Sequence, residues 1–141
     1  MIRKAEHSDL PVLADLALKL WPGHNQEELY EDLRKIMGKP DAAFFLAENG
    51  EGFAQCQLRH DYVEGTESSP VGYLEGIYVE ESCRRKGLAR DLLTACENWA
   101  REQGCREFAS DCELSNEQSL RFHLSVGFEE ANRIICFTKK L

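Results

Sequence analysis

Apolar side chains near the start of the chain recur with the period of two amphipathic helices. Ser8 can cap the first helix, and five apolar residues share one of its faces: Leu10, Leu13, Leu16, Ala17 and Leu20. The pattern breaks at residues 21–24. Asn25 and Glu28 then form a capping-box pattern for a second helix, which Gly38 ends.

Strand patterns come next. Residues 43–48 and 53–60 are two strand-like runs joined by Asn49-Gly50, a dipeptide that readily adopts the positive φ values of a tight turn. We expect an antiparallel hairpin there, and a short strand over residues 2–5 at the start of the chain. A polar loop over residues 61–70 separates this half of the chain from the next.

The second half carries a strand, a helix and a strand in succession, at residues 71–79, 87–103 and 105–111. A crossover of this kind predicts a right-handed connection between parallel strands. A short helix over residues 116–126 and a final strand over residues 133–140 follow. Because the hairpin is antiparallel and the crossover parallel, we expect an α/β (α+β) fold with a mixed, mostly antiparallel central sheet and helices on both faces.

Composition predicts one domain, residues 1–141, because a chain of this length that is 43% hydrophobic fills a single core. The 17 basic and 25 acidic side chains give a net charge of −8. This charge repels nucleic acid, which we do not expect as a partner, and attracts a polycationic ligand. The sequence shows neither a membrane-length apolar stretch nor a signal-peptide pattern, so we expect a cytoplasmic protein without a membrane partner.

Six cysteines show no Cys-x-x-Cys spacing, and several lie within apolar periodic stretches. This usage is typical of buried thiols in a reducing compartment. We therefore expect structural thiols and no metal site, since the spacing favours neither a metal nor a reactive cysteine.

A basic, glycine-containing turn joins the strand over residues 71–79 to the next helix. Arg84, Arg85, Lys86 and Arg90 form the densest basic cluster in an acidic chain, around Gly87. Amides at the start of a helix bind phosphate, because they are free donors at the positive end of the helix dipole. Gly87 lets a bulky anion approach the backbone. The pattern indicates either a phosphate site or a solvated basic turn.

This turn carries a resemblance to a known superfamily. Arg84-Arg85-Lys86-Gly87-Leu88-Ala89 resembles the Q/R-x-x-G-x-G/A pyrophosphate loop of the GNAT superfamily of acetyl-CoA-dependent N-acetyltransferases, and residues 116–128 resemble its later N-x-x-S/A…G-F segment. Nearly the whole chain also resembles bacterial aminoglycoside 6'-N-acetyltransferases. Four blocks carry this narrower resemblance: Leu20-Trp21-Pro22-Gly23-His24, Arg59-His60-Asp61-Tyr62-Val63, Leu74-Glu75-Gly76-Ile77-Tyr78-Val79 and Ala109-Ser110-Asp111.

The resemblance implies a GNAT-like fold, a homodimer, and transfer of the acetyl group of acetyl-CoA to the 6'-amine of aminoglycoside antibiotics, which confers resistance. It implies an antibiotic site formed by five residues: Trp21, His24, Tyr62, Glu75 and Asp111. It also implies a set of cofactor contacts, with the pantetheine arm at Ile77, Tyr78 and Val79, the pyrophosphate at Arg85, Lys86, Gly87, Leu88, Ala89 and Arg90, and Asn116 helping to position the cofactor.

Two positions depart from the patterns of these groups. The superfamily often has a tyrosine as general acid where this chain has His123, and some of the narrower group have an acidic residue where this chain has Asn132. His123 lies between two apolar residues of a helix, so it is either a proton donor or a packed histidine.

The chemistry of acetyl transfer gives the two carboxylates a role. The amine must be neutral to attack a thioester, yet an aliphatic amine with a pKa near about 10.4 is mostly protonated at neutral pH. We expect Glu75 and Asp111 to orient the amine and to accept or relay its proton, at the strand edge where ligands collect. An unpaired amide near Ile77 or Tyr78 would stabilise the oxyanion if the strands splay there, and Gly76 permits such an irregularity.

Both the two carboxylates and the protein as a whole allow alternative interpretations. Glu75 could instead form a structural ion pair, and Asp111 could cap a turn. The whole protein could be a GNAT acetyltransferase for another amine, such as a polyamine, a protein N-terminus or a lysine, or a non-catalytic module that binds acetyl-CoA.

Overall fold

A five-stranded sheet with the strand order β1-β2-β3-β4-β5 forms the centre of the molecule. The structure is a computed structural model that describes residues 1–141. Neighbouring strands are antiparallel except for β4 and β5, which are parallel, so the expected mixed, mostly antiparallel sheet is confirmed. The strands are β1 (Ile2–Lys4), β2 (Ala42–Ala47), β3 (Gly52–Arg59), β4 (Val71–Val79) and β5 (Phe108–Ala109).

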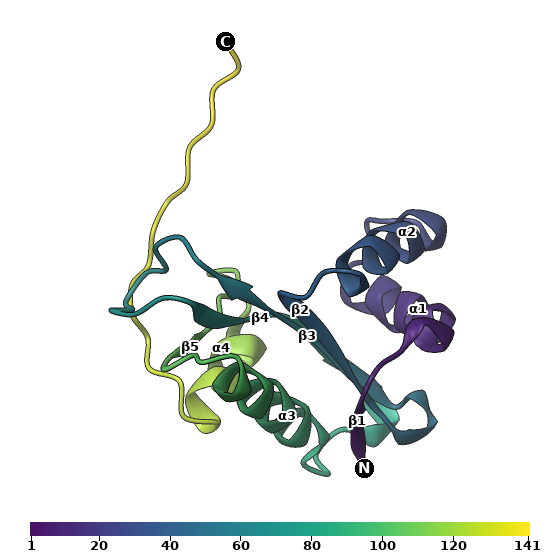
Figure 1. Ribbon diagram of the computed structural model, residues 1–141. Coiled ribbons are helices and arrows are strands. Elements are labelled where there is room, and N and C mark those ends of the chain that lie inside the picture. The colour runs from purple at the N-terminus through teal and green to yellow at the C-terminus, as the bar shows by residue number, and fades with distance from the viewer.

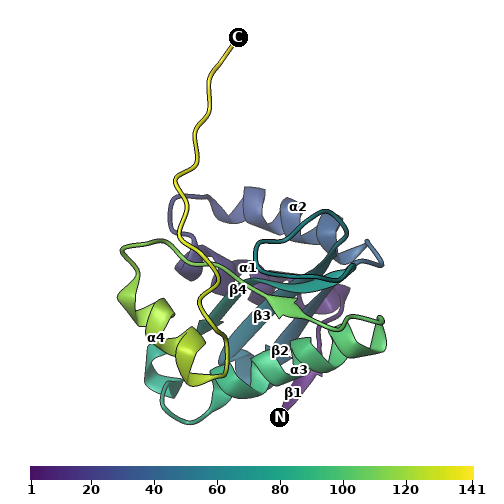
Figure 2. The same cartoon turned by 90° about the vertical axis from the view of Figure 1, so that its left-hand side faces the viewer.

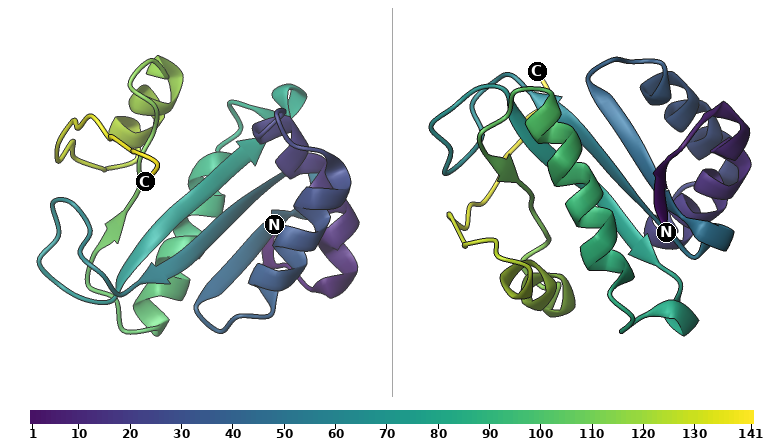
Figure 3. Two further views of the ribbon diagram at one scale, coloured as in Figure 1. Left: turned by 90° about the horizontal axis from the view of Figure 1, so that it is seen from above. Right: turned by 60° about the horizontal axis from the view of Figure 1, so that its bottom comes forward.

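Helices cover both faces of this sheet (Figure 1). On one face, α1 (Leu10–Leu20) and α2 (Gln26–Met37) pack against apolar residues of β2 and β3. On the other face, α3 (Leu88–Glu102) buries Leu92, Cys96 and Trp99 against the sheet. The last helix, α4 (Glu117–Ser125), lies at the β5 end of the molecule, far from α1 and α2 (Figure 3). None of these helices is both long and apolar enough to cross a membrane.

The local signals for the second helix and the hairpin are confirmed. The Asn25 side chain accepts a hydrogen bond from the Glu28 amide and donates one to the Glu28 carboxylate, both at 2.9 Å. Asn49 and Gly50 have φ values of 63° and 69° in the tight turn between β2 and β3. These contacts span only a few residues, which is why the sequence pattern predicts them.

The start of α1 differs from the prediction. A 3₁₀ turn over His7–Asp9 precedes α1, and Asp9, not Ser8, is the residue before its first turn. The Asp9 carboxylate accepts hydrogen bonds from the Glu6 amide at 2.8 Å and from the Arg3 guanidinium at 2.7 Å and 2.8 Å. Asp9 takes this position because its carboxylate pairs with an arginine of β1 and also accepts the amide that closes the turn.

The prediction of a strand over residues 105–111 is too long. Only Phe108 and Ala109 are paired, with Gly72 and Tyr73 of β4. Beyond this point the backbone diverges from β4, and the remaining contacts are made by side chains: the Ser110 hydroxyl lies 3.5 Å from the Leu74 carbonyl, and the Asp111 carboxylate binds the Tyr73 hydroxyl. Residues 75–79 of β4 therefore have no strand on the β5 side, which leaves an open backbone edge.

The prediction of a final strand over residues 133–140 is wrong for the single chain. This segment has no assigned strand or helix, and Figures 1 and 2 show it extending away from the domain. A strand needs a neighbouring strand to satisfy its backbone groups, and none lies beside it. Ile134, Ile135 and Phe137 are consequently 66%, 80% and 87% exposed.

Candidate active site

A β-bulge places Glu75. Gln55 of β3 faces Gly76, whereas the next residue, Cys56, faces Leu74, so Glu75 is an extra residue in β4 without a partner. An extra residue reverses the alternation of side chains along a strand. Accordingly, Leu74 and Ile77, three residues apart, both contact the core cluster under α3. Because of the bulge, Glu75 does not face a core residue of β3. It lies at the point where β4 no longer has β5 as a neighbour.

Glu75 is held by an arginine of the adjacent strand. Nη2 of Arg59 donates to both Glu75 carboxylate oxygens, at 2.5 Å and 3.0 Å, and the Glu75 side chain is 14% exposed. The Arg59 guanidinium also lies over the ring of Tyr73, 3.4 Å from the ring centroid. The structural ion pair considered for Glu75 is therefore present, and it holds the carboxylate on the same side of β4 as Tyr73.

Asp111 lies two residues beyond β5 and is exposed. Its carboxylate accepts a hydrogen bond from the Tyr73 hydroxyl and none from a backbone amide, so it does not cap a turn. Tyr73 is only 6% exposed. Its burial, together with the hydrogen bond to Asp111, raises the pKa of Tyr73 above its ordinary value, so the phenol stays protonated and donates at neutral pH. Tyr73 thereby brings Asp111 toward Glu75.

Trp21 packs directly on the backbone beside Glu75. It follows the last residue of α1, and its ring lies edge-on to Phe53 with the centroids 6.4 Å apart. A Cβ atom added to Gly76 would lie 2.8 Å from two atoms of the indole. Gly76 therefore permits a close approach of Trp21 to β4, next to Glu75.

His24 and Tyr62 lie on exposed loops. The Tyr62 side chain is 75% exposed, and its hydroxyl accepts a hydrogen bond of 3.4 Å from the Gly65 amide. The His24 amide donates to the Trp21 carbonyl at 3.2 Å, which closes the turn after α1. Neither side chain is hydrogen-bonded to Glu75 or Asp111. The structure therefore brings Trp21 together with the two carboxylates but does not bring His24 and Tyr62 to them.

The open edge of β4 offers unpaired backbone groups. The Glu80 amide donates to Glu51 on the β3 side at 2.8 Å, while the Val79 carbonyl accepts from Nε of Arg84 on the opposite side at 2.9 Å. Backbone groups of alternate residues point to the same side of a strand. The N–H and C=O of Ile77 therefore face the side without a strand, as expected for a pantetheine contact and an oxyanion donor.

The turn before α3 has the geometry of an anion site. Gly87 precedes the helix with a φ of 83° and has no side chain to cap it, so the first amides of α3 have no internal acceptor. A Cβ at Gly87 would meet nothing within 4 Å. A cavity of about 220 Å³ lies at this turn, and its walls include Arg84, Arg85, Arg90 and residues of α4. Free amides, arginines and open space together fit a pyrophosphate group.

Two predicted residues on α4 form hydrogen bonds within the protein. Asn116 caps the helix by accepting from the Ser119 amide at 3.0 Å. Nδ1 of His123 lies 2.7 Å from the Ser119 carbonyl and must donate to it, and Nε2 is within hydrogen-bond distance of the Ser110 hydroxyl oxygen, at 2.8 Å. The ring also stacks near Phe128, with the centroids 5.0 Å apart. His123 thus ties α4 to the residue before Asp111.

Sequence reasoning missed Arg59 and Tyr73 as members of this site. The available signal was the position of Tyr73 two residues before Glu75 in one strand, because residues i and i+2 share a face. The bulge at Glu75 and the register of β3 against β4 bring Arg59 over both, and neither can be read from one strand alone.

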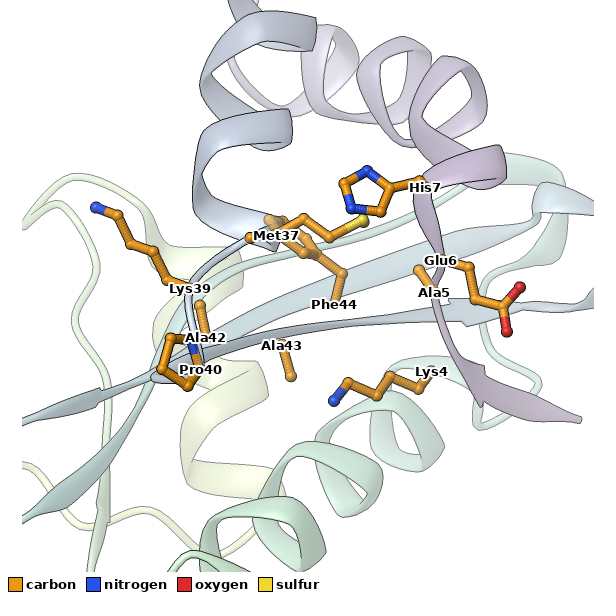
Figure 4. Close-up of a pocket in the computed structure, with 11 residues that line it drawn as sticks. Lys4, Ala5, Glu6, His7, Met37, Lys39, Pro40, Ala42, Ala43 and Phe44 are labelled. Carbon is orange, nitrogen blue, oxygen red and sulfur yellow. The ribbon is translucent and has the colours of Figure 1, made fainter.

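A larger cavity, of about 450 Å³, lies elsewhere, between the segment that follows β1, the end of α2 and the start of β2 (Figure 4). None of the predicted site residues lines it. Its basic side chains, Lys4, His7 and Lys39, point in different directions (Figure 4), so they do not form one binding site. The two predicted carboxylates, Glu75 and Asp111, lie instead on the open side of β4.

Comparison with known proteins agrees with this geometry. Residues 10–128 match the acetyltransferase (GNAT) family. An aminoglycoside N(6')-acetyltransferase type 1 of Stenotrophomonas maltophilia is 44% identical over 144 residues, covering 99% of this chain and 93% of that protein. The protein of the same name from Serratia marcescens is 40% identical over 145 residues, covering 100% and 99%.

A solved structure of AAC(6')-Iy, in complex with the bisubstrate analogue CoA-S-monomethyl-acetylneamine, superposes with a TM-score of 0.94. It is 39% identical, and the match covers 100% of this chain and 98% of that one. The match over residues 10–128 and the full-length similarity lead to one conclusion: the chain belongs to the acetyltransferase (GNAT) family.

Proposed function

We propose that the protein transfers the acetyl group of acetyl-CoA to the 6'-amine of aminoglycoside antibiotics and so confers resistance to them. The similarity to aminoglycoside N(6')-acetyltransferases extends over the full length of the chain. A relative with 39% identity binds an analogue that joins CoA to acetylneamine. The observation that carries the proposal is the pair of carboxylates, Glu75 and Asp111, which Arg59 and Tyr73 link beside the open edge of β4.

Two parts of the chain would hold acetyl-CoA, which supplies an acetyl group activated as a thioester. The open edge of β4 along Ile77 to Val79, where the N–H and C=O of Ile77 face no strand, would bind the pantetheine amides as a neighbouring strand would. The amides that begin α3 and the charges of Arg85, Lys86 and Arg90 would bind the pyrophosphate, with Gly87 leaving room for it. Asn116 would act through α4, which it caps at one end and whose other end, at Phe122 and Ser125, lines the same cavity.

The carboxylates would act on the amine. Glu75 and Asp111 attract the protonated amine, and Glu75 accepts or relays its proton so that the free nitrogen attacks the acetyl carbonyl carbon. A C–N bond forms, the C–S bond breaks, and CoA leaves as a thiolate that takes up a proton. The Ile77 amide stabilises the oxyanion while it exists. We assign Glu75 mainly to proton transfer, because it lies in β4 beside this amide, and Asp111 mainly to substrate binding.

The remaining antibiotic contacts are Trp21, His24 and Tyr62. Trp21 is fixed on β4 beside Glu75, and a polycation bound there would contact its ring. Tyr62 and His24 have exposed side chains that would close on a ligand from the adjoining loops. Their exposure leaves both side chains free to contact a ligand.

The decisive experiment is a panel of amines assayed with acetyl-CoA. We expect acetylation of aminoglycosides that carry a 6'-amine and none at that position in otherwise similar compounds with a 6'-hydroxyl. Spermidine and a peptide with a free N-terminus represent the alternative amines. Preferential use of either by kcat/KM would overturn the antibiotic assignment.

We also propose a homodimer. The segment over residues 133–141 leaves the domain with Ile134, Ile135 and Phe137 exposed, and its backbone is not paired with any strand of the single chain. A second copy of the chain would supply that partner. Light scattering should give twice the chain mass of 16.1 kDa, and a variant that ends at Asn132 should give the single mass. A single mass for the intact chain would contradict the dimer.

The unpaired cysteines support a cytoplasmic location. All six cysteines are unpaired, and three of them, Cys56, Cys96 and Cys105, are buried in the core under α3. Free thiols are typical of a reducing compartment. Cell fractionation should recover the protein with cytoplasmic markers.

A further inference from the structure

Four side chains form a continuous chain of contacts across the open side of β4. The Glu75 carboxylate binds Arg59, the Arg59 guanidinium lies on the Tyr73 ring, and the Tyr73 hydroxyl binds the Asp111 carboxylate. The two carboxylates thus have no direct contact and are linked through two residues, Arg59 and Tyr73. Their relative position is set by residues to which the sequence assigned no role.

The Tyr73 ring is a rigid support. It belongs to a small buried cluster with Val63 and Val71, and only 6% of Tyr73 is exposed. Arg59, by contrast, has a side chain that is 39% exposed, so its position depends on the surfaces that it contacts. A guanidinium that is stacked on an aromatic ring and bound to a carboxylate has few other orientations. Arg59 therefore fixes Glu75 because Tyr73 fixes Arg59.

The Tyr73 hydroxyl has a second task. Asp111 is exposed and follows a strand of only two residues, so the sheet itself holds it weakly. The neighbouring Ser110 is tied to Leu74 at 3.5 Å and to His123 at 2.8 Å, but the Asp111 carboxylate itself is bound only by Tyr73. Without this hydroxyl, the carboxylate would be free to rotate into solvent.

We propose that Tyr73 is a positioning residue for substrate recognition: its ring fixes Glu75 through Arg59 and its hydroxyl fixes Asp111, which sets the spacing at which the two carboxylates meet a polycation. The inference rests on the proposed function, in which these carboxylates bind the antibiotic. A flexible pair of carboxylates would bind many amines weakly, whereas a fixed pair favours a rigid ligand whose amino groups match the spacing.

Tyr73→Phe is the direct test, because it keeps the ring under Arg59 and removes only the hydroxyl. We expect the aminoglycoside KM to rise about tenfold, which corresponds to 1.4 kcal/mol, with kcat and the acetyl-CoA KM within about twofold of wild type. Tyr30→Phe removes a hydroxyl from α2 and should leave all three constants unchanged. Tyr73→Leu also removes the platform, so kcat should fall as well, because Glu75 is then free to move.

A double-mutant cycle separates positioning from a general effect on the fold. In the Asp111→Ala background, Tyr73→Phe should no longer change the aminoglycoside KM, because the hydroxyl has lost its acceptor. A tenfold change that persists in that background, or a wild-type KM in Tyr73→Phe, would refute the assignment.

The same cycle, read by thermal unfolding, does not depend on substrate. Tyr73→Phe should lower the Tm of the otherwise wild-type chain and leave that of Asp111→Ala unchanged. Additive effects on Tm would refute the contact itself. If the wild-type enzyme acetylates no aminoglycoside, the proposed function fails, and this cycle still decides whether Tyr73 holds Asp111.

Discussion

Gly76→Ala tests whether Trp21 is seated against β4 as the structure shows. The added Cβ would lie 2.8 Å from Cζ2 and from Cη2 of Trp21, and 3.1 Å from a methyl carbon of Leu20. Carbon atoms in contact are usually separated by about 3.5–4.0 Å, so the overlap with each indole atom is about 0.7 Å or more. Since Gly76 has no positive φ, the effect is steric and not a strain of the backbone.

The indole cannot easily move away. It is packed edge-on against Phe53, which is fully buried. Overpacking of this kind costs about 1–3 kcal/mol. At about 3 °C per kcal/mol for a chain of this size, we expect the Tm to fall by about 3–9 °C. Because Trp21 lines the proposed antibiotic site, the aminoglycoside KM should rise severalfold while the acetyl-CoA KM stays constant.

Two variants control this experiment. Gly38→Ala adds the same methyl group at a position where the nearest atom is 3.6 Å away, so it should leave the Tm and the kinetic constants unchanged. Trp21→Phe removes the outer ring atoms and should restore most of the stability lost in Gly76→Ala, a non-additive result. A Gly76→Ala protein with the wild-type Tm and KM would refute the seating of Trp21.

Other predictions address the cofactor turn, the carboxylates and stability. Gly87→Val should raise the Kd for acetyl-CoA at least about tenfold by calorimetry, whereas Gly104→Val, at a similar φ of 91° and equally open, controls for backbone strain and should bind normally. Glu75→Gln should lower kcat by about 10²-fold or more, as expected for a general base, whereas Asp111→Asn should mainly raise the aminoglycoside KM, as expected for a binding residue. Both variants are measured across pH 6–9, and the opposite ranking would exchange the two roles. The arginine partner of Asp9 lowers the pKa of this carboxyl from 3.8 to about 2, so its stabilisation is full above pH 4 and is lost as the pH falls toward 2. Asp9→Asn should reduce the free energy of unfolding by about 1 kcal/mol at pH 7 and by less at pH 2, and an equal reduction at both would exclude the ion pair as the cause.

Local sequence determined the features that depend on a few neighbouring residues. The Asn25 cap and the turn at Asn49 and Gly50 follow from hydrogen bonds and φ preferences within four residues. The turn proposed to bind the pyrophosphate also belongs here, because Gly87 and the amides that follow it form one continuous segment. The cap and the hairpin turn satisfy their backbone groups within the segment, whereas the turn at Gly87 leaves the first amides of α3 without an internal acceptor.

Tertiary structure alone decided the arrangement of the carboxylates and the length of the last strands. The bulge that frees Glu75 exists only in the pairing of β3 with β4, and the support of Asp111 by Tyr73 requires β5 to lie beside β4. The apolar pattern over residues 133–140 favours a strand, but a strand forms only where another backbone is available to pair with it. Alternation within a strand is a local property, whereas its partner, register and end are set by segments far away in the sequence.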